Sequence, residues 1–209
     1  LADTVGATLD LNSNNNTIAS LAGGGTTGGN VTLGTGTLTT GGDNSSTSYG
    51  GVISGAGVLL KTGSGTLTLT GTNTYSSGTQ VTGGAVSVVA DANLGDSAGT
   101  LALNNGQLTT TGAFSSSRPV TLTNTGTINT GSALTLSGAL TGTGGLTKAG
   151  SSTLTLSGTS NGYSGTTTVS EGTLQAGAAN AFSSSSAVSL ANTVGATLDL
   201  NSINNTIAS

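Results

Sequence analysis

The first twenty residues of the chain return almost unchanged as its last twenty. Leu1–Ser20 reads LADTVGATLDLNSNNNTIAS and Leu190–Ser209 reads LANTVGATLDLNSINNTIAS, so 18 of 20 positions are identical at an offset of 189 residues. Self-similarity at a fixed period is typical of solenoids, in which each unit buries its apolar surface against its neighbours. The repeat therefore predicts a segment of a longer tandem array.

A second repeat lies inside the first. The run Lys61–Gly71, KTGSGTLTLTG, returns at an offset of 87 residues as Lys148–Gly158, KAGSSTLTLSG. We therefore expect one continuous β-solenoid segment over residues 1–209. Its subrepeats are expected at approximately 1–102 and 103–189, and residues 190–209 restart the 189-residue repeat.

Apolar residues alternate with Thr or Ser in short clusters such as Thr66–Thr70 and Thr153–Leu156. A period of two is typical of a β-strand with one face buried. Runs of Gly, Asn, Asp and Ser separate the clusters and predict turns. The pattern predicts an all-β fold whose inward residues include Leu67, Leu69, Leu154, Leu156, Leu198 and Leu200.

Short strands at this spacing also occur in β-sandwiches and barrels. Only 2% of the residues are aromatic, although Gly, Thr and Ser together make up more than half of the chain. A narrow interior of stacked aliphatic side chains suits this composition better than a globular core. We expect a parallel β-helix of about nine to ten coils, each of roughly 20 to 24 residues.

The composition excludes several classes of function. The three basic residues (Lys61, Arg118 and Lys148) and a pI near 4.1 provide no nucleic-acid footprint. The chain has no His or Cys, and its seven acidic residues are scattered. We expect no catalytic, cofactor-binding or metal-binding residues, no cofactor and no enzyme activity in this segment. No apolar stretch reaches membrane-spanning length, so we expect no membrane insertion by this segment.

Several polar residues have both a structural and a functional interpretation. Asp91 and Asp96 lie in a turn-like stretch, which favours solvated turn chemistry over an acid–base pair. Asp43, after Gly41-Gly42, lacks the serial Gly-Gly-x-Gly-x-Asp pattern of calcium-binding β-rolls. Asp10 and Asp199 occupy the same repeat position, are expected to point outward, and would discourage aggregation.

Two further pairs occupy matched repeat positions. Lys61 and Lys148 are expected at coil corners, where the long side chain covers apolar surface, with ligand binding as the alternative. Tyr75 and Tyr163 are expected to cap a corner of the core, with carbohydrate stacking as the alternative. Phe114 and Phe182 have no repeat partners and are assigned to packing.

Four segments match the N-glycosylation sequon. We interpret their Asn residues instead as members of turn ladders; the segments begin at Asn15, Asn30, Asn44 and Asn204. Outward Thr-x-Thr pairs such as Thr66/Thr68 and Thr153/Thr155 suggest a flat hydroxyl face. Asp10, Ala102 and Gln175 interrupt that pattern.

One longer motif resembles the passenger-associated strand repeat of autotransporters. The motif runs from Gly65 to Val88, GTLTLTGTNTYSSGTQVTGGAVSV, with a second copy from Ser152 to Leu174. The second copy has one extra residue before its Tyr, and Glu171 stands where the first has Gly83. The resemblance implies a right-handed parallel β-helix, secreted to the surface of a Gram-negative bacterium and joined elsewhere to an outer-membrane β-barrel.

We therefore expect a structural and adhesive β-solenoid rod from a giant repetitive surface or extracellular fibre protein. The expected partners are adjacent repeats of the same chain, laterally associated copies, and host or environmental surface glycans. One alternative is a glycan- or ice-binding module that uses a flat Thr/Ser face. Another is a passive scaffold for an enzyme or effector domain outside this segment.

Overall fold

The computed structural model describes residues 1–208, so Ser209, the last residue of the restarted repeat, lies outside it. The described residues form two compact units, Leu1–Leu101 and Ala102–Ser209 as bounded by their internal contacts. Strands of two to five residues dominate each unit, and the only helix among residues 1–208 is one short 3-10 turn, η1 (Asp91–Leu94). The predicted all-β class is confirmed.

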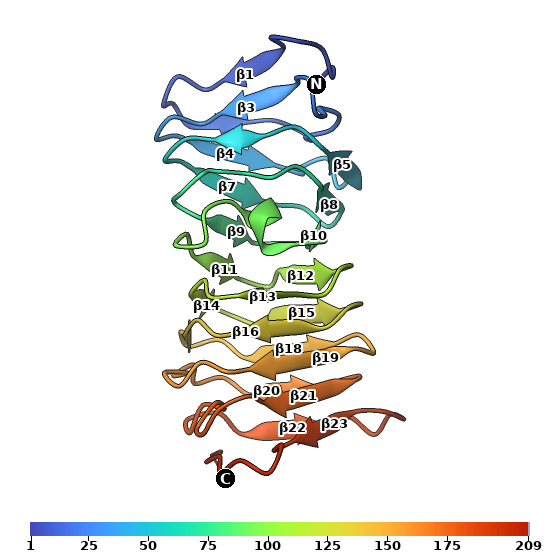
Figure 1. The fold of residues 1–209 in the computed structure, drawn as a ribbon, viewed down its shortest axis with the longest axis vertical. Coiled ribbons are helices and arrows are strands. Elements are labelled where there is room, and N and C mark those ends of the chain that lie inside the picture. Colours follow the sequence, from blue (N-terminus) through green and yellow to red (C-terminus); the bar gives the residue numbers. More distant parts are fainter. Residues whose placement is uncertain (209) are drawn as a thin grey trace. The chain divides into compact units, whose positions relative to one another are not determined.

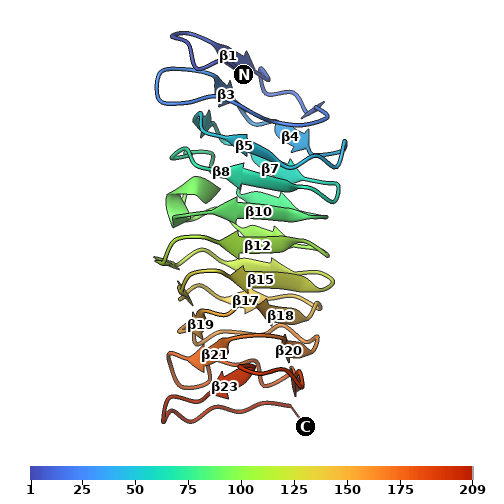
Figure 2. The ribbon, with the colours of Figure 1, turned by 90° about the vertical axis from the view of Figure 1, so that its right-hand side faces the viewer.

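Unit 1 is a stack of coils whose strands fall into three sheets (Figures 1 and 2). The first sheet contains β1 (Thr8–Asp10), β3 (Asn30–Thr32) and β6 (Ile53–Ser54). The second contains β2 (Asn16–Thr17), β4 (Thr37–Thr40), β7 (Val58–Lys61) and β9 (Thr79–Val81). The third contains β5 (Thr47–Tyr49), β8 (Thr66–Leu69) and β10 (Ala85–Val88).

Unit 2 repeats this arrangement. One sheet contains β14 (Val120–Leu122) and β17 (Leu140–Thr141), next to β11 (Leu101–Leu103), which begins at the last residue of unit 1. Another contains β12 (Gln107–Thr110), β15 (Gly126–Thr130), β18 (Leu146–Ala149), β20 (Thr167–Val169) and β22 (Val188–Leu190). The last contains β13 (Phe114–Ser116), β16 (Leu134–Leu136), β19 (Thr153–Leu156), β21 (Thr173–Ala176) and β23 (Thr197–Asp199).

Within each unit, neighbouring strands are parallel and belong to successive coils. Leu38 pairs with Leu59, and Leu134 pairs with Leu154, so a strand meets its partner about one coil later in the sequence. The separation ranges from 19 residues, between Leu67 and Val86, to 24, between Leu174 and Leu198. The parallel β-solenoid of about ten turns is confirmed, and a sandwich or barrel is excluded.

The alternation of Leu and Thr produces the core. Along β19 the burial alternates, with Leu154 and Leu156 fully buried and Thr153 and Thr155 partly exposed. Direct pairing stacks identical side chains, as in the row Leu134, Leu154, Leu174 and Leu198. Burying a Leu side chain contributes about 1.5–3 kcal/mol, so each coil adds to a continuous aliphatic row.

The predicted inward positions are mostly confirmed. Leu67, Leu69, Leu154 and Leu156 are buried, and Leu198 is partly buried. The prediction for Leu200 is wrong, because this side chain is 46% exposed. Its repeat equivalent, Leu11, is only 3% exposed, since residues 21–42 cover that coil.

Among residues 1–208, no helix has the length and apolar character needed to cross a membrane.

Replacing Leu154 with Asp would place a carboxylate in the aliphatic row. We expect the free energy of unfolding to fall by at least about 3 kcal/mol, because a buried unpaired charge is strongly destabilising. Urea unfolding followed by circular dichroism measures the effect. The control is Thr153→Asp on the outward side of the same strand, for which we expect a change within about 1 kcal/mol. Equal stability of the two variants would contradict the assigned core.

Candidate functional site: a hydroxyl ladder and polar corners

One column of hydroxyl side chains runs along the outer surface of a sheet in unit 2. The register places Thr127 beside Thr147, Thr147 beside Thr168, and Thr168 beside Ser189. All four side chains are partly or fully exposed. Parallel strands lie about 4.8 Å apart, so the column offers one hydroxyl per coil at that spacing. We call these four residues the hydroxyl ladder.

The neighbouring sheet has a mixed column instead. Thr135 and Thr155 lie beside each other, and the column continues with Gln175 and Asp199. The Gln175 amide donates to Asp199 Oδ2 at 2.9 Å. This hydrogen bond, followed by the one from the Asn201 N–H, lowers the pKa of Asp199. The interruption predicted at Gln175 is confirmed.

The two repeated lysines are not surface side chains. Lys61 and Lys148 lie at coil corners, as predicted, but both are essentially fully buried, so the ammonium does not reach solvent. The Lys148 ammonium donates to the carbonyls of Ala149, Gly150 and Glu171 at 2.8, 2.6 and 2.9 Å. Lys61 makes the equivalent bonds to the carbonyls of the next two residues. Each ammonium therefore provides hydrogen-bond donors to carbonyls that turn inward at a coil corner.

Burial changes the acidity of both lysines. Desolvation lowers the pKa of Lys148 to about 8, opposed by the attraction of Glu171. Desolvation also lowers the pKa of Lys61, opposed by Asp43. Asp43 accepts from the backbone and hydroxyl of Ser45, and these bonds lower its own pKa. These corners combine a buried cation with a nearby surface carboxylate.

The two repeated tyrosines close the core at a coil corner, as predicted. Tyr75 and Tyr163 are fully buried. The Tyr163 hydroxyl shares a hydrogen bond of 2.7 Å with Thr167, which in turn meets Ser186 at 2.8 Å. The Tyr75 hydroxyl meets Thr79 at 2.6 Å in the same way. Phe182 is also buried, whereas Phe114 is partly exposed.

Turn ladders were predicted for the asparagines of all four sequon matches, and three of the four bond to the next coil in this way. The side-chain oxygens of Asn15, Asn30 and Asn44 each accept a backbone N–H from the following coil at 2.8–2.9 Å. The fourth match begins at Asn204, whose carbonyl accepts the N–H of Asn180, and it is the next residue, Asn205, that accepts from Phe182.

Two further asparagines also bridge neighbouring coils through their side chains, and the sequence analysis did not identify them. Asn73 is buried, accepts the Ile53 N–H at 2.8 Å and donates to the carbonyl of Asn93. Asn161 accepts the Leu140 N–H and donates to the carbonyl of Ala181. Their matched places in the two subrepeats were the available signal. The buried Arg118 was also not anticipated.

The acidic residues serve turns. Asp91 lies in η1, and Asp96 accepts the N–H of Ala98 at 2.9 Å, as predicted for turn chemistry. Asp10 and Asp199 each accept the N–H two residues later at 2.8 Å. Across residues 1–208, no three His, Cys, Asp or Glu side chains gather where they could hold a metal ion.

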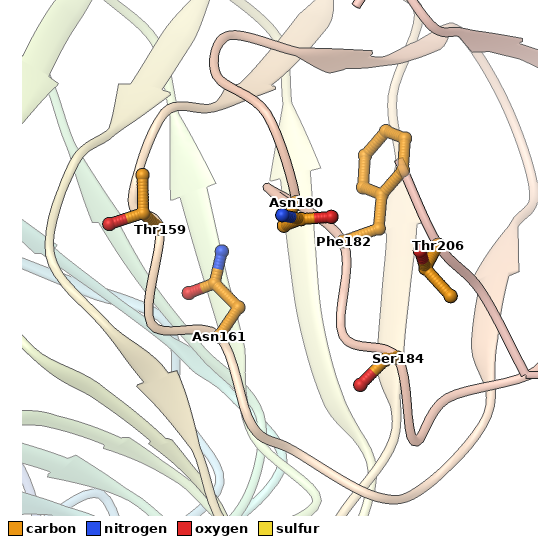
Figure 3. Close-up of a pocket in the computed structure, with 6 residues that line it drawn as sticks. All are labelled: Thr159, Asn161, Asn180, Phe182, Ser184 and Thr206. Atoms are coloured by element: carbon orange, nitrogen blue, oxygen red, sulfur yellow. The ribbon is translucent and has the colours of Figure 1, made fainter. Parts of the chain in front are cut away.

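Two recesses open on the surface of the described residues. One, of about 320 Å³, lies in unit 2 and is drawn in Figure 3; its lining residues are Thr159, Asn161, Asn180, Phe182, Ser184 and Thr206. The other, of about 480 Å³, lies in unit 1 between Asn30, Val52 and the glycine-containing corners at 24–25, 50 and 71. The Asn161 and Asn30 amides that face these recesses already bond to backbone groups.

Comparisons with known proteins match the regions that contain the lysine and tyrosine corners. The passenger-associated-transport-repeat family matches residues 59–88 and 146–176, which hold β8–β10 and β18–β21. The chain carries two autotransporter passenger repeats. The sequence-based recognition is confirmed, and with it the assignment to a secreted segment displayed at the bacterial cell surface.

One relative extends the likeness beyond these repeats. The adhesin BmaC autotransporter of Brucella suis biovar 1 (strain 1330) is 40% identical over 128 residues, or 56% of this chain. The chain spans only 4% of the length of that protein. No solved structure gives a significant match.

Replacing Lys148 with Met tests the corner assignment. The change removes the ammonium that donates to three carbonyls, of which only that of Ala149 keeps another donor among the described residues, the Thr130 hydroxyl at 3.3 Å. We therefore expect a loss of about 1–3 kcal/mol in the free energy of unfolding near pH 7.

The same variant should change the pH dependence. Because the folded-state pKa lies near 8 and the unfolded value near 10.5, the unfolded state holds more protons between these values. The stability contributed at this position therefore rises with pH over that window in the wild type and not in Lys148→Met. Denaturant titrations from pH 7.5 to 10 measure both curves, and parallel curves would contradict a depressed Lys148 pKa.

Proposed function

We propose that the segment is a structural and adhesive spacer within the passenger of a bacterial surface adhesin, with no catalysis of its own. The bonding between coils carries this proposal. Backbone ladders join successive strands, Asn side chains bridge the corners, and aliphatic rows run through each unit. The adhesin named among its relatives supports the same function.

We further propose that residues 1–209 belong to one continuous solenoid with subrepeats at about 1–102 and 103–189. In this proposal the number of repeats sets the length of the shaft. The matched corners support it, because Lys61 and Lys148, and Tyr75 and Tyr163, make equivalent contacts at offsets of 87 and 88 residues. Lateral association of such shafts into fibres extends the same proposal.

Pulling the full chain between its termini in optical tweezers tests the mechanical function. Each coil contacts only its neighbours, so we expect extension in steps that release single coils or small groups of coils. A coil of about 20 residues adds roughly 70 Å of extended chain. Leu154→Asp should lower the force of at least one step, while Thr153→Asp should not. Extension without resistance, as for a disordered chain, would contradict the proposal.

A second candidate function is glycan binding at the hydroxyl ladder. It is favoured by the uninterrupted column from Thr127 to Ser189, which offers hydroxyl groups on a partly exposed sheet surface. Hydroxyl groups both donate and accept, as sugar recognition requires.

Replacing Thr147 and Thr168 together with Val removes two of these hydroxyls and preserves side-chain shape. On a glycan array, we expect the signal of the double variant to fall at least several-fold. The matched control changes Thr121 and Thr141, which pair on another sheet of the same unit, to Val. Equal loss in both variants, or no signal from the wild type, would remove this candidate.

A further inference from the structure

The chain contains two Asn-Gly pairs, and both lie in turns of unit 2. Asn105–Gly106 connects β11 to β12, and Asn161–Gly162 lies in the loop between β19 and β20. Glycine has no Cβ, so its amide nitrogen can approach a neighbouring side chain that a bulkier residue would block. At these two pairs a backbone nitrogen can therefore attack the side chain of the preceding asparagine most readily.

The side chain of Asn161 is fixed by hydrogen bonds at both ends of its amide. Its Oδ1 accepts the Leu140 N–H at 2.7 Å, and its Nδ2 donates to the carbonyls of Gly158 and Ala181 at 3.1 and 2.6 Å. The Gly162 N–H donates to the Leu140 carbonyl at 2.8 Å. Both the attacking nitrogen and the carbon that it would attack are therefore held in place.

The side chain of Asn105 is not restrained in this way. It is exposed to solvent, and among residues 1–208 no hydrogen bond holds its amide. Its φ of +59° lies in the left-handed region, which Asn tolerates better than most residues. The turn is joined to the next coil through its neighbour instead, because Asn104 Oδ1 accepts from Asn124 Nδ2 at 2.6 Å. The two Asn-Gly pairs share the same chemistry and differ in restraint.

We propose that Asn105 is a site of spontaneous deamidation in the folded chain. The Gly106 amide nitrogen gives its proton to hydroxide, attacks Cγ of Asn105 and forms a C–N bond. The side-chain nitrogen takes up a proton from water and leaves as ammonia, so a cyclic imide remains. Water then opens the ring at Cγ, which gives aspartate, or at the main-chain carbon, which gives isoaspartate. The whole reaction consumes one water molecule and releases one ammonia.

The turn has to open before the nitrogen can reach Cγ. In the left-handed region the Gly106 nitrogen points away from the Asn105 side chain, so the Asn105 Cα–C bond must rotate. Exposed turns are among the parts of a fold that open locally at the smallest free energy. At Asn161 the same movement would first break three side-chain hydrogen bonds. We therefore expect the folded chain to react at Asn105 more slowly than the unfolded chain, and at Asn161 more slowly still.

Isoaspartate at this position changes the main chain itself. The link between residues 105 and 106 then passes through the former side chain, which inserts an extra carbon into the backbone just before β12. The Gly106 carbonyl accepts the Thr127 N–H at 3.0 Å, and Gln107 pairs with Thr127 in the ladder to β15. An extra backbone atom beside these bonds disturbs the register between two coils. Aspartate keeps the backbone and adds only a surface charge.

The modification bears on the lifetime of a segment displayed outside the cell. It needs only water as co-reactant, so no partner has to reach the turn. A load-bearing shaft depends on the register between coils, so a slow accumulation of isoaspartate would weaken it at one defined turn as the protein ages. The chemistry of the turn does not depend on whether the segment is adhesive.

Peptide mass spectrometry of the full chain tests the proposal. The chain is incubated in mildly alkaline buffer, once folded and once unfolded in urea, and is then digested with trypsin. Trypsin cuts after Lys61 and Lys148 but not after Arg118, which precedes a proline. Each Asn-Gly pair therefore falls in a peptide of its own, residues 62–148 or 149–209. Fragmentation assigns the replacement of NH2 by OH to one residue, and an unincubated sample corrects for reaction during digestion.

The two sites serve as each other's control. In the folded chain we expect conversion at Asn105 to be at least several-fold faster than at Asn161. In urea the two rates should become similar, because the motif alone then determines them. Asn105→Gln should abolish the fast conversion in peptide 62–148, since the longer side chain forms the ring far more slowly. Equal rates at both sites in the folded chain, or no conversion at Asn105 while the unfolded chain reacts, would overturn the proposal.

The effect on the register has a separate readout. The isoaspartate form of the aged chain is separated by chromatography and compared with Asn105→Asp, which carries the same charge without the extra backbone carbon. We expect the isoaspartate form to unfold at a lower urea concentration than Asn105→Asp, as measured by circular dichroism. Identical unfolding midpoints would contradict a disturbed register.

Discussion

The register between successive coils is the constraint on which the rest of the structure depends. In a parallel sheet every strand must place its N–H and C=O groups opposite those of the next coil, because a buried backbone group without a partner is costly. Coils of 19 to 24 residues all satisfy this requirement, so differences in length are taken up between strands. The strands can then stay short and uniform, and their inward residues form continuous rows.

The corners therefore hold most of the specialised side chains. Lys148 donates to three carbonyls at a coil corner, and Asn44 supplies an acceptor to the next coil. A lysine is suited to this position because its ammonium carries three donors and no acceptor. Gly150, with φ +76, provides one of those carbonyls from a backbone conformation that side chains rarely adopt.

The sequence predicts the burial of a side chain where its position along a single strand determines it. The prediction fails where the burial depends on contacts with a neighbouring coil. Alternation alone identified Leu67 and Leu154 as inward, and matched spacing identified Tyr75 and Tyr163 as corner residues. The burial of Leu200 depends on a following coil, so strand periodicity alone could not predict it. Lys61 was misread because long cationic side chains usually keep the charge in water, whereas here inward carbonyls replace the water.

The two passenger repeats also show how one core accommodates different corners. Beside the first repeat, Asn93 of the η1 turn donates to the Gly71 carbonyl inside it. In the second, the equivalent carbonyl of Gly158 accepts instead from Asn161, beside the recess in Figure 3. The extra residue before Tyr163 falls in this same loop. The two corners thus differ in their surface while the Tyr–Thr hydrogen bond beneath each is retained.

The outward acidic residue at the repeat position of Asp10 and Asp199 affects both the pairing of coils within a chain and the association of identical coils. Inside unit 2, Asp199 receives a hydrogen bond from Gln175, so the preceding coil accepts the charge. Inside unit 1, Asp10 lies beside Thr32, so the following coil accepts it as well. Only another copy of the same coil would place carboxylate beside carboxylate. The single acidic residue at this outward position of the repeat therefore permits stacking between different coils and opposes stacking between identical ones.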